Sequence, residues 1–451
     1  MQESLKVKLL EMIDKYPELK FQFIFQDWET DFLRFYRSQT NYNISKKAKF
    51  LNTSVYKGKK SLSFAIANPS VEAFMEKIEG VLDTIDSLPE DPDFVDLETD
   101  TRKSDEKTKE NNIEKMSLEK KIAYLSKLSE ALEPYHFRVY GTFICNYENR
   151  YLINSNGLDK KMNTSPIYFE VKAVSDQNEV TVLEAFGSEN ASSFDIDAII
   201  EKMKQKVQIA MSEVVDVDPD EYEVILAPRC IGEYLAYYSW SSCSAGSLDR
   251  KNTLLEGKIG EQIFPEHFTL IDDPTDPMIV NFDYNSEGHL YAKTPVFEKG
   301  VFKNFLVGSY YAHKLNLQEN GAEASCLVMN TGDKSLDDMI KSVKKGLYIS
   351  SLHYMNFINP KESSITGLTR DGTFLIEDGK LTKVVNNLRF TVKISDVINH
   401  ITEIENQSYT FPMSDNYGQF SVNAFRMPHV KVKSFKISSS TKTVRSEEHT
   451  S

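Results

Sequence analysis

Residues 364–387 have the sequence SITGLTRDGTFLIEDGKLTKVVNN, and this stretch decides the fold expected for the second half of the chain. Its short apolar runs are interrupted by two Asp-Gly pairs, Asp371-Gly372 and Asp378-Gly379. Asp-Gly fits the left-handed backbone of a two-residue turn, so the pattern predicts two tight hairpins in succession. Short strand patterns recur from Glu221 onward, and we therefore expect a β-rich domain, barrel or sandwich-like, over residues 221–444.

The first half of the chain mixes helical and strand patterns. Residues 1–89 predict an α+β module with an amphipathic first helix, strands over 21–68 and a helix capped by Ser70. Residues 118–220 predict a second α+β module, in which amphipathic helices at both ends enclose hairpin patterns. The expected fold class is therefore α+β, with antiparallel sheets and helices mixed in the N-terminal half and a β-rich C-terminal half.

Two segments are set apart from these modules. Residues 90–117 are almost entirely charged or polar, so we expect an acidic, exposed linker or surface loop that cannot bury enough apolar surface to fold. Residues 445–451, RSEEHTS, match one reading frame of a widely used sequencing-library adapter. We exclude them as a probable assembly artefact, and the native C-terminus beyond Val444 is then not known.

The composition limits the classes of partner. The net charge of −14 and the isoelectric point near 5.2 disfavour binding to nucleic acid or to anionic membranes, both of which depend on basic surface. The sequence shows no signal peptide and no apolar run long enough to span a bilayer. Its cysteines are far apart, which favours reduced thiols and a cytoplasmic protein. They are Cys145, Cys230, Cys243 and Cys326.

The residue patterns alone do not identify an active site. His267 and His289 are the closest pair of histidines before the tail, so a histidine–zinc site would have to be assembled from distant segments. The chain has neither a GxSxG nucleophile elbow nor a GxxxxGK[ST] phosphate loop. Acidic residues at 271–277 and 335–340 could bind a hard cation, but aspartates next to proline or before a helix usually form turns and caps.

One short stretch, LAPRCIGEYLAYYSWSSC at 226–243, combines two cysteines with one acid, Glu233. Ile231, Leu235 and Tyr238 follow helical spacing, which predicts a packing helix. The two cysteines are expected to be small buried apolar residues rather than nucleophiles.

Several motifs together resemble the TldD/PmbA family of zinc-metallopeptidase-related proteins. They are NSNG at 154–157, ILAP at 225–228, LLEGKIGEQIF at 254–264, TLIDDP at 269–274 and ITGLTRDGTFLIEDGKL at 365–381. The match covers most of the chain, and the order and spacing of the motifs are specific to the family. The resemblance implies dimers around an internal cavity, in which a catalytic TldD-type chain pairs with a TldE/PmbA-type chain as one cytosolic peptidase.

Catalytic members of this family carry His-Glu-x-x-x-His on the helix that follows the ILAP-like strand. When this motif is placed on the chain from Pro228 and Gly232 without gaps, the first histidine falls on Ala236, the glutamate on Tyr237 and the second histidine on Ser241. An alanine and a serine cannot replace imidazoles on zinc, and a tyrosine is too weak an acid to serve as the base. The resemblance therefore implies that this half of the zinc motif is absent.

The remaining zinc ligand of the family is a cysteine in a later Cys-Gly-Lys segment. That segment matches MSDNYGQ at 413–419, which places Ser414 at the thiolate position. We therefore expect a TldE/PmbA-like, non-catalytic chain without its own metal, paired with a zinc-bearing TldD-like subunit or with a second copy of itself. Its expected substrates are peptides and unfolded proteins, which an edge strand of the β-rich half could hold by backbone pairing.

Two other functions remain open at this stage. The chain could be a self-sufficient homodimeric peptidase that uses residues such as Arg370, Asp371 or Cys326. It could also be a non-enzymatic regulator that binds proteins, since the family carries the description "modulator of DNA gyrase". Thr369, Arg370 and Asp371 either line the cavity or the dimer face, or belong to a tight hairpin with a local ion pair. The sequence leaves the partner, the substrates and any residual activity undetermined.

Overall fold

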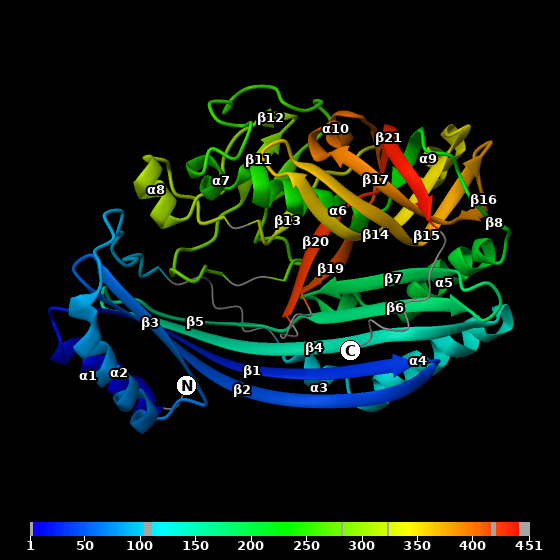
Figure 1. Cartoon of the computed structure of the whole chain (residues 1–451). Coiled ribbons are helices and arrows are strands. Elements are labelled where there is room, and N and C mark those ends of the chain that lie inside the picture. The colour runs from blue at the N-terminus through cyan, green and yellow to red at the C-terminus, as the bar shows by residue number, and fades with distance from the viewer. Residues whose placement is uncertain (1–2, 103–109, 281–282, 323, 416–420, 442–451) are drawn as a thin grey trace.

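The computed structural model describes residues 3–102, 110–280, 283–322, 324–415 and 421–441. A long curved sheet from the N-terminal half lies beneath a C-terminal half built of further sheets (Figure 1). The expected α+β class is thus confirmed. No helix in these ranges is both long and apolar enough to cross a membrane.

The N-terminal sheet has the strand order β3-β2-β1-β4-β6-β7, with β5 added to β4. Its strands are β1 (Lys20–Tyr36), β2 (Gln39–Lys57), β3 (Lys60–Ala67), β4 (Phe137–Asn154), β5 (Asp159–Thr164), β6 (Ile167–Ser175) and β7 (Thr181–Ser188). Strand β1 pairs with β2 on one side and with β4 on the other. The two modules expected at 1–89 and 118–220 therefore share one sheet.

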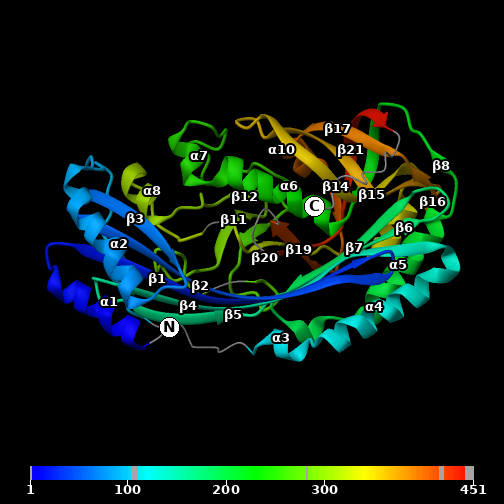
Figure 2. The same ribbon diagram turned by 60° about the horizontal axis from the view of Figure 1, so that its bottom comes forward.

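Helices cover the two ends of this sheet (Figure 1, Figure 2). At one end, α1 (Glu3–Lys15) and α2 (Val71–Thr84) pack on the aromatic start of β1, and Ser70 caps α2 as expected. At the other end, α4 (Leu118–Leu132) and α5 (Ile196–Ala210) pack on β4 and β6. Aromatic residues at alternating positions of the strands supply this core, because one face of each strand is turned to the helices.

The segment at 90–117, expected to be an exposed linker or surface loop, is anchored to the rest of the protein at several points in its described part. Leu97, Asn112 and Met116 are buried, and a short helix, α3, spans Asn112–Lys115. The Asn154 side chain donates a hydrogen bond of 2.9 Å to the Glu98 carbonyl, which fixes this segment to the end of β4. A polar composition did not prevent packing, because backbone groups of the segment bond to the sheet.

The C-terminal half contains a β-barrel. The barrel strands follow the order β14-β9-β21-β17-β15, and β14 also pairs with β15, which closes the ring. They are β9 (Glu221–Leu226), β14 (Lys345–Asn359), β15 (Ser364–Glu377), β17 (Asn387–Lys393) and β21 (Val430–Thr441). Strands β8 (Val214–Val215), β16 (Lys380–Val385) and β18 (Ile401–Ile404) extend the same sheet, and α10 (Ile394–Asn399) packs on its core. The barrel was one of the two β-rich forms expected.

The two Asp-Gly pairs have different structures. Asp378-Gly379 forms the predicted turn between β15 and β16. Asp371-Gly372 is not a hairpin turn, because β15 continues through it as a β-bulge opposite Ser350 of β14. Both bulge residues have positive φ, 52° and 115°, so the same left-handed preference that makes turns also makes this bulge.

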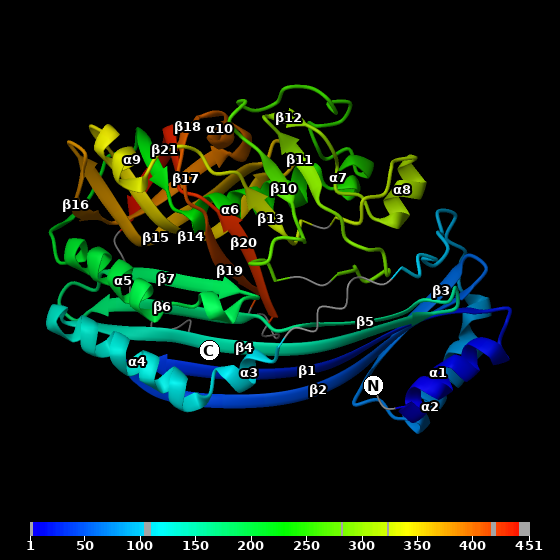
Figure 3. The same cartoon turned by 180° about the vertical axis from the view of Figure 1, so that it is seen from behind.

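A second C-terminal sheet, here called the outer sheet, has the order β12-β11-β10-β13-β20-β19. Its strands are β10 (Leu270–Asp272), β11 (Thr294–Glu298), β12 (Val301–Phe302), β13 (Leu327–Met329), β19 (Tyr409–Asp415) and β20 (Ser421–Met427). Strands β19 and β20 run down toward the N-terminal sheet (Figure 3). Helix α6 (Pro228–Tyr238) shares one hydrophobic core with the barrel and the outer sheet, so it lies at the centre of the C-terminal half.

Candidate functional site

Helix α6 carries the positions at which catalytic relatives are expected to hold zinc. The helix begins at Pro228, where the missing N–H costs no helical hydrogen bond, and ends at Tyr238, after which residues 239–243 form a π-helical turn. Tyr234 is fully buried against Phe390 and Phe435 of the barrel. The packing helix predicted from its spacing is confirmed.

Ala236 and Tyr237 lie on the last turn of α6, and both pack at the edge of the core. The Tyr237 hydroxyl donates a 3.0 Å hydrogen bond to the Met355 carbonyl, and its ring lies 5.3 Å from that of Phe357. Burial raises the pKa of Tyr237, and the negative charge of Glu233 adds to the shift. The phenol therefore stays protonated near neutral pH and cannot accept a proton from water as a base.

The other two positions offer only hydroxyl groups. Ser241 is buried in the π-helical turn, with its Oγ 3.3 Å from the Oγ of Ser242. Ser414 belongs to β19, where it pairs with Val422, and its side chain lies outside the described part of the structure. Zinc sites in proteins use imidazole, thiolate and carboxylate ligands. The residue types at these positions do not fit a zinc ion.

Strand β19 nevertheless lies against α6. A Cβ atom placed on Gly232 would come within 2.0 Å of Cζ of Phe411, which is buried on β19. Gly232 thus permits the close approach of the strand that carries position 414 to the helix that carries position 236. The helix and the strand to which the resemblance assigns the zinc ligands therefore lie next to each other, although the residue types at the assigned positions do not fit zinc.

Glu233, the one acid of this stretch, takes part in an ion network instead. Arg229 contacts Glu170 of β6 at 2.8 Å and Glu233 at 3.2 Å. Burial raises the pKa of Glu233, although Arg229 opposes the shift. Arg229 thereby joins α6 to the N-terminal sheet, and Glu233 has a structural role as one of its partners.

The cysteines, all of which lie in the described part of the chain, are buried and form no disulfide. Burial raises the pKa of Cys145 to about 11, and it raises the pKa values of Cys230 and Cys243 as well. Cys326 is also buried. A nucleophilic cysteine needs an accessible thiolate, which these environments disfavour.

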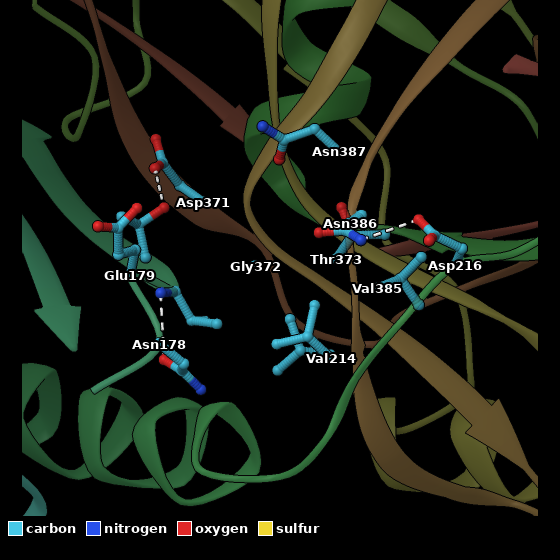
Figure 4. Close-up of a pocket in the computed structure, with 13 residues that line it drawn as sticks. Asn178, Glu179, Val214, Asp216, Asp371, Gly372, Thr373, Val385, Asn386 and Asn387 are labelled. Atoms are coloured by element: carbon cyan, nitrogen blue, oxygen red, sulfur yellow. Dashed lines mark hydrogen bonds between the residues drawn. The ribbon is translucent and has the colours of Figure 1, made fainter. Parts of the chain in front are cut away.

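A cavity of about 480 Å³ lies where the β6–β7 turn faces β15, β16 and β8 (Figure 4). Asp371 is among its lining residues, accepts a 2.7 Å hydrogen bond from Thr181 and pairs with Lys172 at 3.0 Å. Burial alone would raise the pKa of Asp371, but Lys172 and the Thr181 hydroxyl together hold it below its ordinary value. Across the cavity, Asn386 donates to Asp216 at 2.8 Å.

The neighbours of Asp371 are placed differently. Thr369 is fully buried, and its hydroxyl accepts hydrogen bonds from Thr373 and from the Leu388 amide, so it does not reach the cavity. Arg370 pairs along the strand with Ser351 and is not a lining residue. Among the described lining residues there are carboxylates, amides and threonines but no histidine, cysteine or lysine. The described lining therefore offers no cysteine nucleophile and no histidine base.

The acidic stretches form turns and caps, as expected. Asp272 accepts hydrogen bonds from the amides of Ala324 and Cys326, and Asp273 bonds to Thr275 and pairs with Lys293. In residues 335–340, Ser335 caps the helix α9 (Leu336–Ser342).

An exposed aromatic patch was missed in the sequence. We define the aromatic patch as Trp240, which is 66% exposed, and the partly buried Phe357 on which its ring packs. The Trp240 ring lies 5.9 Å from that of Phe357, next to Tyr237. A tryptophan within the polar run SWSS is the signal that could have revealed it.

Comparison with known proteins gives two family matches. The model of the "PmbA/TldA metallopeptidase C-terminal domain" matches residues 219–439, and that of the corresponding central domain matches residues 111–211. The chain belongs to the PmbA/TldD family. The resemblance inferred from the motifs is thus confirmed, and the central-domain match begins within the segment expected to be a linker.

Two solved structures are similar to this PmbA/TldD-family protein over nearly its whole length. The crystal structure of TldE from Thermococcus kodakarensis has a TM-score of 0.86 at 21% identity and covers 96% of this chain and 99% of that one. A Thermotoga maritima protein, described as a candidate modulator of a DNA gyrase, has a TM-score of 0.82 at 17% identity, covering 97% and 100%. At these identities the likeness establishes the fold.

Sequence relatives in the family carry protease names. A protein of Methanothermobacter thermautotrophicus named "Metalloprotease" is 25% identical over 191 residues, which are 40% of this chain and 42% of that relative. The alignment thus spans less than half of the relative's length. Activity, substrates and partners of the whole protein do not follow from it.

Proposed function

We propose that this chain is a TldE/PmbA-like subunit of a cytosolic TldD/TldE-type metallopeptidase. A TldD-like partner holds the zinc ion, and this chain helps to enclose peptides and unfolded proteins. One observation carries the proposal: the zinc-motif positions hold Ala236, Tyr237, Ser241 and Ser414, none of which is a zinc ligand or a base of suitable strength. The zinc-dependent step therefore belongs to the partner.

The aromatic patch supports the need for a partner. The exposed Trp240 ring packs on Phe357, whose ring also contacts Tyr237 at the end of α6. Exposed tryptophans are enriched at protein–protein interfaces, where they bury a large apolar area. In this proposal the patch contacts the TldD-like chain, so the partner would lie next to the motif positions of this chain.

Strand β19 supports the binding of extended substrates. It is an edge strand of the outer sheet, because β20 is its pairing partner along Tyr409–Asp415. An extended peptide can add to such an edge through main-chain hydrogen bonds, which suits loosely sequence-dependent cleavage.

The alternatives have less support. Asp371 is held by Lys172 and Thr181, and Cys326 is buried, so neither has the setting of a nucleophile in a self-sufficient peptidase. A non-enzymatic regulator would bind partner proteins without contributing to peptide hydrolysis, and this outcome is distinguished by the experiment below.

The test is co-expression with a TldD-type chain that has an intact His-Glu-x-x-x-His motif. We expect stable co-purification and hydrolysis of casein by the complex but not by either chain alone. Replacing the motif glutamate of the TldD-type chain should abolish the activity. Casein hydrolysis by the present chain alone would contradict the proposal, and a stable complex whose activity does not depend on this chain would favour the regulator.

The variant Trp240→Ala tests the patch within the same experiment. We expect it to weaken co-purification at least about tenfold, since buried tryptophans dominate interface energies. Met211→Ala is the matched control, because Met211 is an exposed apolar side chain just beyond α5 in the N-terminal half. Equal loss in both variants would argue against the patch as the interface.

A further inference from the structure

Three residues from distant segments form a cluster outside the site described above. Glu98 follows the first module, His289 lies between β10 and β11, and Glu319 follows the helix α8 (Ser309–Leu315). The Nδ1 atom of His289 is 3.1 Å from Oε2 of Glu98 and 3.3 Å from Oε1 of Glu319. One ligand atom from each residue lies within 4.8 Å of the others, and all three side chains are partly buried.

The first two ligand groups are held in place by their surroundings. The Oε1 atom of Glu98 accepts hydrogen bonds from the amides of Thr99 and Asp100, which leaves Oε2 facing the histidine. The amide of His289 donates to the Asn285 side chain at 3.0 Å. These bonds fix the direction of one carboxylate and the position of the imidazole.

A glycine brings the third segment to the histidine. Gly321 has a φ of 63°, and a Cβ atom there would come within 2.5 Å of the His289 ring. The chain that carries Glu319 can therefore pass directly over the imidazole. A side chain at position 321 would hold the two segments apart.

The cluster holds more carboxylate oxygens than the imidazole can serve as a donor. Nδ1 of His289 can donate a single proton, yet it faces two carboxylate oxygens. Oε1 of Glu319 is buried and makes no hydrogen bond with any described residue. A buried carboxylate oxygen without a hydrogen-bond donor calls for a compensating partner, and a bound cation would supply it.

The spacing suits a small divalent ion. A tetrahedral zinc ion with ligands at about 2.0–2.2 Å keeps neighbouring ligand atoms about 3.3–3.6 Å apart. The Glu319 oxygen, 3.3 Å from Nδ1 of His289, meets this spacing, and the Glu98 oxygen, at 3.1 Å, would move outward by a few tenths of an ångström. One imidazole with two carboxylates favours Zn²⁺ or Mn²⁺ over Ca²⁺, which prefers oxygen ligands alone.

We propose that Glu98, His289 and Glu319 bind a divalent transition-metal ion, with Zn²⁺ as the first candidate. The site is separate from the α6 motif positions, and it does not depend on the proposed function. Because Asn154 of β4 holds the Glu98 backbone, the ion would tie the N-terminal sheet to two loops of the C-terminal half. Its role would then be to join the two halves.

The experiment uses the full chain, freed of metal with a chelator and titrated with Zn²⁺ by calorimetry. We expect one equivalent to bind and to raise the melting temperature. Glu319→Gln keeps the shape of the side chain but removes its charge, and we expect it to weaken zinc binding about tenfold or more. Circular dichroism shows whether the variant remains folded.

Two control variants locate the ion. His313→Ala removes an exposed histidine of α8, and Ser241→Ala changes a position of the α6 motif. Both should bind Zn²⁺ like the parent. The absence of binding to the parent chain at 100-fold excess of Zn²⁺, or full binding by Glu319→Gln, would overturn the proposal. Loss of binding in Ser241→Ala would instead place zinc at α6 and contradict the proposed function.

Discussion

At the scale of residues, buried charges show how strongly this fold depends on individual pairs. Lys121 of α4 is fully buried and pairs with Asp31 of β1 beneath the Phe143 ring. Asp31 also accepts a 2.9 Å hydrogen bond from Ser45. A lysine in the core of a helix–sheet interface was not evident from the sequence, because its helical spacing is compatible with exposure.

We expect Lys121→Met to lower the free energy of unfolding by about 3 kcal/mol, because the change leaves a carboxylate buried without its cation. Urea unfolding measures the effect. Lys127→Met, on the same helix, is the matched control, since Lys127 pairs with Asp197 at the surface and should matter by less than about 1 kcal/mol. Equal effects of the two substitutions on the free energy of unfolding would show that the burial of the Lys121–Asp31 pair does not add to its effect on stability.

His353 gives a residue-scale prediction about pH. Burial lowers the pKa of its imidazole to about 4, and Arg370 adds to the shift. The unfolded chain, with a pKa near 6.5, therefore binds this proton first as the pH falls. The free energy of unfolding therefore keeps its full contribution from His353 above about pH 6.5, and this contribution is lost progressively as the pH falls toward 4.

We expect His353→Gln to flatten the pH dependence of stability between about pH 6.5 and 4. Urea midpoints measured at several pH values for the variant and the parent would show this. His429, whose pKa burial also lowers against the pull of Glu405, should retain its own contribution in both proteins. Parallel curves for the two proteins would disprove the assignment to His353.

At the scale of elements, the contact of α6 with β19 is the most sensitive part of the candidate site. We expect Gly232→Ala to lower the free energy of unfolding by about 1–3 kcal/mol, since the added methyl group would overlap the Phe411 ring. Phe411→Leu should restore part of the loss when combined with it, which a double-mutant cycle would detect.

Gly80→Ala is the control for this prediction. Gly80 lies within α2 and has open space around its Cβ position, so alanine should be neutral or stabilising there. If Gly232→Ala were as harmless as Gly80→Ala, the close approach of β19 to α6 would be refuted.

The two Asp-Gly pairs show what could be predicted at this scale and what could not. Local sequence predicted a left-handed conformation at both, and both have it. Whether such a pair turns the chain or forms a bulge depends on the partner strand, and β14 continues past Asp371-Gly372. Long-range pairing therefore decided the outcome, although the β-rich class was still predicted correctly.

The site was predictable only in part for a similar reason. The positions on α6, in the turn that follows it and at Ser414 were assigned from the family resemblance. The aromatic patch, the ion network of Arg229 and the Glu98–His289–Glu319 cluster are each formed by segments far apart in the chain. Without tertiary contacts, a lone histidine or glutamate gives no indication of its neighbours.

At the scale of the whole molecule, the two halves share one core. Ile225, Tyr348 and Phe374 of the barrel lie in the same hydrophobic cluster as Phe169 and Met203 of the N-terminal half. The pairs Arg229–Glu170 and Lys172–Asp371 also cross between the halves.

We therefore expect the isolated C-terminal half, residues 219–441, to expose this apolar surface and aggregate. Size-exclusion chromatography and the fluorescence of a hydrophobic dye would measure this, with the full chain as the reference. Co-expression with residues 1–218 should recover a soluble complex. A monomeric, well-folded C-terminal half would mean that the shared cluster contributes little to stability.

The burial of the cysteines has a practical consequence for tests of the proposed complex. Alkylating reagents attack accessible thiolates, and Cys145, Cys230, Cys243 and Cys326 are all buried. In a complex with a TldD-type chain, rapid labelling by iodoacetamide under native conditions would thus report on the partner's thiols alone. Because its own thiols would react slowly, mass spectrometry could follow any accessible cysteines of the partner without interference from this chain.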